Sequence, residues 1–159
     1  AISDWLASQT RWRIISQGSG DLGQRMQHVW QTLGGGAIVF LGVDCPDVPS
    51  EAMKRVGTSL KDADVAVGPV SDGGYWTLTA RQSAPSLLTG IDWGTATVYH
   101  QTLQAAARSG LQLVALTAWH DVDGPADLLA LRRRLIDQDE PALVRLRQQL
   151  DHICEDIVR

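Results

Sequence analysis

The chain has 159 residues, of which 44% are hydrophobic and 20% charged, an ordinary composition for one globular domain, which we expect to span residues 1–159. The formal net charge is -4, and no cluster of Lys and Arg lies beside aromatic residues, so no nucleic-acid partner is expected. No apolar run approaches the ~18 residues of a membrane helix, and the first residues lack the pattern of a signal peptide. Because the two cysteines have no metal-binding spacing, we expect a reduced, cytoplasmic protein without membrane contact.

The first clear periodicity follows Asp21. Asp21 and Gln24 have the spacing of a capping box, and the glycines at 34–36 would end the helix. The apolar residues that recur at helical spacing are Leu22, Met26, Val29, Trp30 and Leu33. Before this helix, residues 11–15 predict only a short strand.

Four segments in the middle of the chain predict strands, because they are short apolar or β-branched runs bounded by turn residues. The segments are residues 37–43, 65–69, 75–79 and 111–117. All but the third lack polar alternation, which is typical of strands buried on both faces of a parallel sheet.

Two helices are expected between these strands, over residues 50–60 and 95–109. Thr95 would cap the second helix, and Gly110 would end it. The side chains expected to face inward are Tyr99, Leu103, Ala106 and Ala107.

Two more helices are predicted at the C-terminal end. Glycine and proline at 124–125 open the first, with leucines along one face, and the second covers residues 140–156. The alternation of strands and helices indicates an α/β fold, namely a three-layer α/β/α sandwich around a mostly parallel sheet.

Aspartates follow three of the apolar runs. In chain order they are Asp44, Asp72 and the pair Asp121 and Asp123. Parallel strands finish at one edge of a sheet, and ligands of open α/β sheets bind there, so these carboxylates should converge on one crevice. Clustered carboxylates suit a hard divalent cation that also holds phosphate oxygens.

Each acid also has a plainer interpretation. Asp44 has an equal claim as a turn residue, and the turn at Asp72, taken alone, favours a β-hairpin because Asp-Gly is a strong hairpin signal. One acid near the start of the next helix should cap that helix, and Asp127 in its first turn is expected to point outward. Asp123 is then the preferred cation ligand and Asp121 the second choice.

Several short motifs occur in a fixed order along residues 17–135, and the ordered set is more specific than any single motif. They are Gln17, Gly20-Asp21-Leu22-Gly23, Arg25-Met26, Gly42-Val43-Asp44-Cys45-Pro46, Gly68-Pro69, Asp72-Gly73-Gly74-Tyr75, Trp93-Gly94-Thr95 and Asp121-Val122-Asp123. Together they resemble the DUF2064 family, an uncharacterised family of glycosyltransferase-like proteins related to the glycosyltransferases of arsenosugar biosynthesis.

The resemblance implies the fold called GT-A, of the nucleotide-diphospho-sugar transferase superfamily, which also contains guanylyltransferases of molybdenum cofactor and of phospholactate. It implies that Asp44 and Asp123, with Asp121 beside the latter, hold Mg²⁺ or Mn²⁺ on the nucleotide phosphates. It also implies a catalytic role for Asp72, whose turn would contact the acceptor or the sugar. The implied substrate contacts from this turn and from the segment across from it are Gly73, Gly74, Tyr75, Trp93, Gly94 and Thr95.

The chain departs from the family pattern at its start. Family members begin with a further strand and a loop containing Gly, Lys and Arg that grips the nucleotide, and the sequence from Ala1 starts after it. We therefore expect a GT-A-like fold lacking the first strands, with unpaired backbone beside the strand that leads to Asp44. A homodimer is expected, in which another chain or residues 11–16 complete that edge.

The expected function is a metal-dependent glycosyltransferase that takes a nucleotide-activated sugar and a small-molecule acceptor, and this chemistry needs no nucleophilic residue. The alternative enzyme is a nucleotidyltransferase, because the same acids would serve either reaction. A third interpretation is a truncated remnant that folds and dimerises without catalysing, because fold resemblance does not carry function when a binding element is missing.

Overall fold

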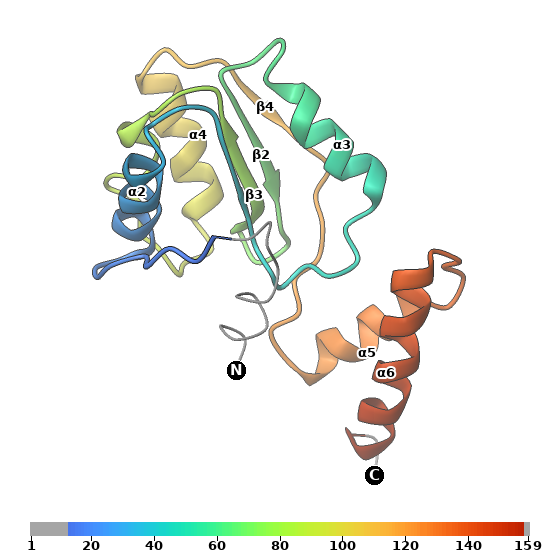
Figure 1. Ribbon diagram of the computed structural model, residues 1–159. Helices are drawn as coiled ribbons and strands as arrows, with labels where there is room; N and C mark the ends of the chain where they lie inside the picture. Colours follow the sequence, from blue (N-terminus) through green and yellow to red (C-terminus); the bar gives the residue numbers. More distant parts are fainter. Residues whose placement is uncertain (1–12, 158–159) are drawn as a thin grey trace.

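The computed structural model describes residues 13–157, with side chains up to residue 153 (Figure 1). Four strands form one sheet in the order β1-β3-β2-β4. The elements are α2 (Leu22–Thr32), β1 (Ile38–Leu41), α3 (Ser50–Ser59), β2 (Val65–Pro69), β3 (Tyr75–Ala80), the 3₁₀ turn η1 (Pro85–Leu87), α4 (Val98–Arg108), β4 (Leu113–Ala115), α5 (Pro125–Arg134) and α6 (Pro141–Ile157). No helix of this described part is both long and apolar enough to cross a membrane.

The sheet is mixed, and the prediction of a mostly parallel sheet is wrong. β3 pairs antiparallel with both β1 and β2, and only β2 and β4 pair in parallel. The reason is the short connection at 70–74, which forms a hairpin between β2 and β3, whereas a parallel pair needs a long crossover. β1, β2 and β4 nevertheless run in one direction, so their carboxyl ends share one edge of the sheet.

Helices lie on both sides of this sheet. α2 and α4 lie on one side and α3 on the other (Figure 1). The larger core lies under α2 and α4, where Trp30 packs edge-on against Phe40 and the fully buried Val67 and Leu78 belong to the same cluster. α5 and α6 extend away from the sheet, so the three-layer sandwich is not established for the whole chain.

β1 is an edge strand, and the prediction that it is buried on both faces is wrong. Val39 and Leu41 are 44% and 46% exposed, whereas the central β2 is buried throughout its apolar run. The Gly42 N–H donates to Trp76 O at 2.8 Å, and antiparallel pairing alternates, so the N–H and C=O groups of Val39 and Leu41 face away from β3. Among the described residues, no strand pairs with that outer edge.

Local helix signals were predicted with mixed success. The capping box of α2 is present, because Gln24 N donates to Asp21 Oδ1 at 2.8 Å and Asp21 N to Gln24 Oε1 at 2.9 Å. α4 begins later than predicted, with Thr97 rather than Thr95 at its N-cap, because Thr95 stabilises the preceding turn by donating to Asp92 O. Ala107 is exposed, contrary to prediction.

Two of the predicted strands, at residues 11–15 and 111–117, also differ from the structure. Residues 13–15 are irregular rather than a strand, and 11–12 lie outside the described residues. β4 covers only part of the predicted strand at 111–117, and Val114 in it is 39% exposed because β4 lies at the other edge of the sheet.

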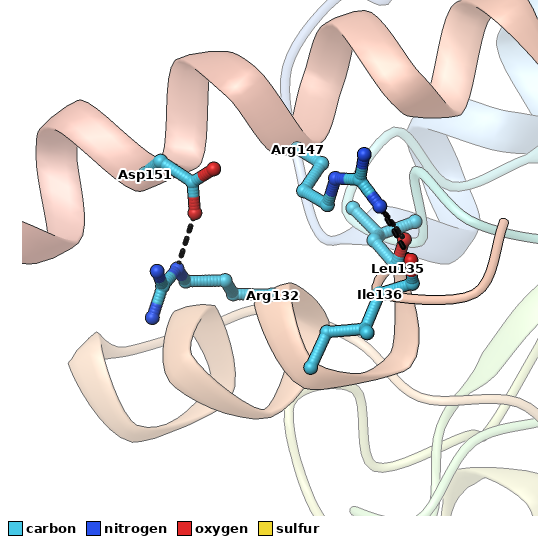
Figure 2. Close-up of polar contacts among 5 residues, drawn as sticks. All are labelled: Arg132, Leu135, Ile136, Arg147 and Asp151. Atoms are coloured by element: carbon cyan, nitrogen blue, oxygen red, sulfur yellow. Dashed lines mark hydrogen bonds and ion pairs between the residues drawn. The ribbon is translucent and has the colours of Figure 1, made fainter.

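α5 and α6 form a hairpin with its own apolar cluster around Leu131, Leu135 and Leu150. An ion pair joins the two helices, with Arg132 Nε 2.5 Å from Asp151 Oδ1 (Figure 2). Arg147 of α6 donates to the carbonyls at the end of α5 and so satisfies backbone groups that the helix leaves unpaired. These contacts join α5 and α6 to each other.

Candidate active site

A pocket of about 300 Å³ opens at the carboxyl ends of β1 and β2 and beside the segment that follows β4. It combines apolar side chains with three aspartates. The residues that line it are Leu22, Asp44, Val70, Asp72, Gly74, Tyr75, Trp93, Gly94, Thr95, Ala96, Val98 and Asp121. Of the predicted metal ligands and substrate contacts, only Gly73 and Asp123 are missing from this lining.

The hairpin turn after β2 forms one wall of the pocket. Gly74 N donates to Asp72 Oδ1 at 2.8 Å, which fixes the carboxylate against its own turn. Gly73 adopts a φ of +92°, and a Cβ built there would lie 2.1 Å from Ala96 O. The turn therefore needs glycine at position 73 to come this close to Ala96. The same turn closes the β2–β3 hairpin and forms part of the pocket wall.

A β-bulge in β3 aims two aromatic residues in different directions. The pairing of β2 and β3 shifts between Gly68 and Pro69, so that Trp76 has no directly opposite residue in β2. Trp76 packs into the cluster beneath α3, while Tyr75 packs on the α4 side and reaches the pocket. Bulges commonly re-aim side chains beside functional sites, and this one brings an aromatic ring to the pocket.

The segment before α4 forms the facing wall. Trp93 is half-buried and packs edge-on against Tyr75, with the ring centroids 6.3 Å apart and the planes at 83°. The hydroxyl groups of Thr95 and Thr97 form a hydrogen bond of 2.7 Å, which orders the turn that leads into α4. All of the predicted substrate residues except Gly73 thus line the pocket, and each of the two walls carries one aromatic ring.

Three of the four predicted acids come together. One carboxylate oxygen each from Asp72, Asp121 and Asp123 lies within 4.8 Å of the others. The backbone brings the segments together, because Trp119 N donates to Pro69 O at 2.9 Å and extends the alignment of β2 and β4 towards the pocket.

Asp44 lines the same pocket but is not a member of this close group. Its carbonyl accepts from Val122 N at 3.0 Å, so the backbone of the loop after β1 touches the acidic segment. Its carboxylate accepts a weak hydrogen bond from Cys45 Sγ at 3.8 Å. Asp72 thus lies in the close group with Asp121 and Asp123, whereas Asp44, the ligand implied by the family resemblance, lines the same pocket outside that group.

The remaining acid of this region, Asp127, caps α5. Its Oδ2 accepts from Gly124 N at 2.9 Å and from Asp123 N at 3.2 Å. The prediction that one acid would cap this helix is confirmed, and the carboxylate of Asp127 turns back to the helix start instead of pointing away from it. The backbone of Asp123 is thereby fixed from the helix side.

The aspartates give this pocket a negative charge, and among the described residues no Lys or Arg lines it. Burial raises the pKa of Asp121, and the neighbouring carboxylates of Asp72, Asp123 and Asp44 raise it further, against the lowering effect of a backbone hydrogen bond. Burial, followed by the charges of Asp44 and Asp121, likewise raises the pKa of Cys45 to about 12. Such a site favours a cation.

The donor set fits a hard divalent metal. Carboxylate oxygens are the ligands of Mg²⁺ and Mn²⁺, and Mg²⁺ sites that bind phosphates typically use only one or two protein carboxylates. Oxygens from Asp72, Asp121 and Asp123 that lie within 4.8 Å of one another can converge on one ion. Cys45 is buried and protonated, so it adds no soft ligand.

Sequence reasoning missed Asp47, which is buried with only 5% of its surface exposed. It accepts hydrogen bonds from Trp119 and Arg134, two residues far along the chain. The local sequence gives little signal, because the prolines at 46 and 49 restrict their own φ angles and the backbone of Val48 but not that of Asp47. Its partners could not be identified from the sequence.

Comparisons with known proteins identify the family of this chain. Residues 1–95 match the family described as "Uncharacterized protein conserved in bacteria (DUF2064)". A crystal structure from Desulfovibrio desulfuricans G20, named "putative nucleotide-diphospho-sugar transferase", is similar at a TM-score of 0.74 and 34% sequence identity, over 87% of this chain. The matched region covers 64% of that protein's chain. A comparison with curated proteins finds no match.

Proposed function

Because the chain belongs to the DUF2064 family, we propose that it acts in a transferase reaction on a nucleotide-activated sugar, with a divalent cation held by Asp72, Asp121 and Asp123. The name of the similar Desulfovibrio protein supports the substrate class. The observation that carries the proposal is the convergence of three carboxylates beside a pocket that, within residues 13–157, has no basic lining residue. A bound cation would compensate the charge of a diphosphate in this acidic pocket.

The proposed cation is Mg²⁺ or Mn²⁺, which would supply charge neutralisation of the leaving diphosphate when bound. Asp44, which lines the pocket without joining the close group, would assist through its charge or through water. This assignment keeps Asp121 and Asp123 as ligands and adds Asp72, whose turn is part of the pocket wall.

The walls of the pocket would bind and orient the substrates. The paired rings of Tyr75 and Trp93 offer an apolar surface of the kind that packs against a sugar ring. Gly94 and Thr95 lie beside them and offer backbone and hydroxyl groups for hydrogen bonds. Asp72, the proposed catalytic residue, would orient the acceptor hydroxyl, because its carboxylate is fixed by Gly74 at the pocket wall.

The proposal predicts that the carboxylates are needed for cation binding. Titration of the chain with Mn²⁺ by calorimetry should give saturable binding, and Asp123→Asn or Asp121→Asn should weaken it by about tenfold or more, because each removes a charged ligand. Asp137→Asn is the matched control, because Asp137 is exposed in the turn between α5 and α6 and lies outside the acidic group. An affinity unchanged in both ligand variants would refute the proposed site.

A second titration separates the proposed transferase from its alternatives. In the presence of Mn²⁺, the chain is offered nucleoside-diphosphate sugars and, separately, nucleoside triphosphates. Preference for the diphosphate sugars supports glycosyl transfer, and preference for the triphosphates supports nucleotidyl transfer. Binding of neither class would indicate that this chain does not itself carry the donor site.

A further inference from the structure

Asp47 is the only charged residue buried in the described core, and its carboxylate is fully engaged. Oδ1 accepts from Trp119 Nε1 at 3.0 Å and from Arg134 Nη2 at 3.2 Å, and Oδ2 accepts from Arg134 Nε at 2.7 Å. Arg134 thus grips the carboxylate with two nitrogens, which is the stronger and more directional form of this ion pair.

The two partners of Asp47 flank the acidic segment. Trp119 lies two residues before Asp121, and Arg134 belongs to α5, which starts two residues after Asp123. Between them, the loop that carries Asp47 also binds the middle of the segment, through the bond from Val122 N to Asp44 O. The loop after β1 therefore holds the acidic segment before, within and after its two carboxylates.

This ion pair differs from the others of the described residues in its burial. The side chains of Arg134 and Asp47 are 26% and 4% exposed, against 47% and 41% for Arg132 and Asp151. Exposed pairs contribute little because water screens them, whereas a shielded pair with two hydrogen bonds holds its geometry. The ion pair between Asp47 and Arg134 is thus suited to fixing the loop after β1 against α5.

The acidic group needs such a restraint. Carboxylates this close repel one another when no cation is bound, and the repulsion would tend to move the segment 121–123 away from Asp72. The contacts of Asp47 with Trp119 and Arg134, and the bond from Val122 N to Asp44 O, use no carboxylate oxygen of Asp121 or Asp123. They can therefore hold the segment in place and leave these oxygens free to bind the cation. A site held ready in this way binds its ion without first having to be assembled.

We propose that Asp47 is a positioning residue, which sets the affinity of the acidic group for its cation by holding Trp119 and Arg134 on either side of the segment. This role rests on the proposed cation site, but Asp47 itself does not touch the ion. Removing its charge should loosen the segment and weaken cation binding, because residues that orient metal ligands typically contribute about 10–100-fold in affinity.

The test compares Asp47→Asn with Asp151→Asn. Both variants weaken an ion pair of α5, but only the first pair also involves Trp119, close to the acidic segment, whereas the second joins α5 to α6 (Figure 2). Dissociation constants for Mn²⁺ are measured by calorimetry, and melting temperatures are measured separately in EDTA. We expect Asp47→Asn to weaken Mn²⁺ binding by about tenfold or more and Asp151→Asn to leave it unchanged.

Trp119→Phe provides a second, milder test, because it keeps an aromatic ring and removes only the Nε1 donor to Asp47. It should weaken Mn²⁺ binding less than Asp47→Asn does. The double variant should bind no more weakly than Asp47→Asn alone, because both changes act through one contact. Arg134→Lys, which keeps the charge, should bind Mn²⁺ more tightly than Arg134→Met.

The outcomes separate two kinds of failure. If the unchanged chain does not bind Mn²⁺, the proposed function fails. If it binds, and Asp47→Asn binds equally well while still folded, the positioning role is refuted. If Asp47→Asn does not fold, Trp119→Phe decides, and an affinity equal to that of the unchanged chain refutes the role. Loss of affinity in Asp151→Asn would also refute it, because any loosening of α5 would then suffice.

Discussion

Gly73 lies where the turn after β2 meets the segment before α4. Its φ of +92° belongs to the left-handed region, and its carbonyl accepts from Tyr99 N at 2.8 Å, so the turn also fixes the first turn of the helix. The sequence marks this glycine only as part of a hairpin signal. Its close contact with Ala96 depends on how the chain folds back, which no local pattern shows.

Gly73→Ala should therefore be strongly destabilising. The added Cβ would meet the backbone of Ala96 at 2.1 Å, in addition to the cost of the positive φ, and we expect a loss of about 2–3 kcal/mol or more in the free energy of unfolding. Urea denaturation gives the value.

Gly94→Ala is the control, because Gly94 also has a positive φ, +79°, but no atom within 4 Å of an added Cβ. Gly94→Ala should lower the free energy of unfolding by only about 1 kcal/mol, which is the cost of a positive φ for alanine. Equal losses in the two variants would show that the contact with Ala96 is unimportant.

Among the elements, α2 and α3 each contain a glycine, and the two glycines have different surroundings. Gly57 lies in the last turn of α3, exposed, with no atom within 4 Å of an added Cβ. Gly23 is buried in α2, where a Cβ would lie 2.2 Å from Leu88 O and 2.5 Å from Trp93 Nε1. The first glycine only weakens its helix, whereas the second lets α2 approach the pocket wall.

The two substitutions to alanine should have opposite signs. Gly57→Ala should raise the free energy of unfolding by about 0.5–1 kcal/mol, because alanine loses less backbone entropy in a helix. Gly23→Ala should lower it, because α2 must move away from Leu88 and Trp93. Thermal and urea denaturation of both variants provide the comparison, and two changes of the same sign would contradict the packing described here.

On the scale of the whole molecule, the outer edge of β1, with which no strand of the described residues pairs, is the feature that most needs a partner. The backbone groups of Val39 and Leu41 face outward, and Val43 just beyond the strand is 99% exposed. Apolar side chains on an unpaired edge favour association with another strand. A homodimer through this edge stays a prediction, since the structure contains one chain.

Light scattering after size-exclusion chromatography tests that prediction. If a second copy pairs with β1, the chain should associate as its concentration rises, and Leu41→Lys should shift it towards the monomer by placing a charge on the edge. Ile136→Lys is the control, since Ile136 is 58% exposed on the α5–α6 hairpin, away from β1. A chain that stays monomeric at all concentrations would contradict the prediction.

Much of the fold could be predicted because local chemistry decides it. The bounds of β2 and the capping box of α2 follow from short-range signals, and the sheet elements occur where apolar runs predict them. The predictions failed where distant packing decides. Ala107 is exposed although it belongs to an apolar stripe, and Thr95 does not cap α4 because its hydroxyl binds Asp92 O.

The sequence by itself determined that the strand ends carry aspartates and which short motifs surround them, because residue type and spacing along one segment are local properties. Only the tertiary structure decided that Asp72 joins Asp121 and Asp123, that Asp44 stays outside this group, and that Asp47 holds the segment between its partners. The reason is that these distances depend on the antiparallel insertion of β3 and on the bulge beside it. The insertion of β3 requires its pairing with β1, which is distant in sequence, and the bulge belongs to the register of the β2–β3 hairpin.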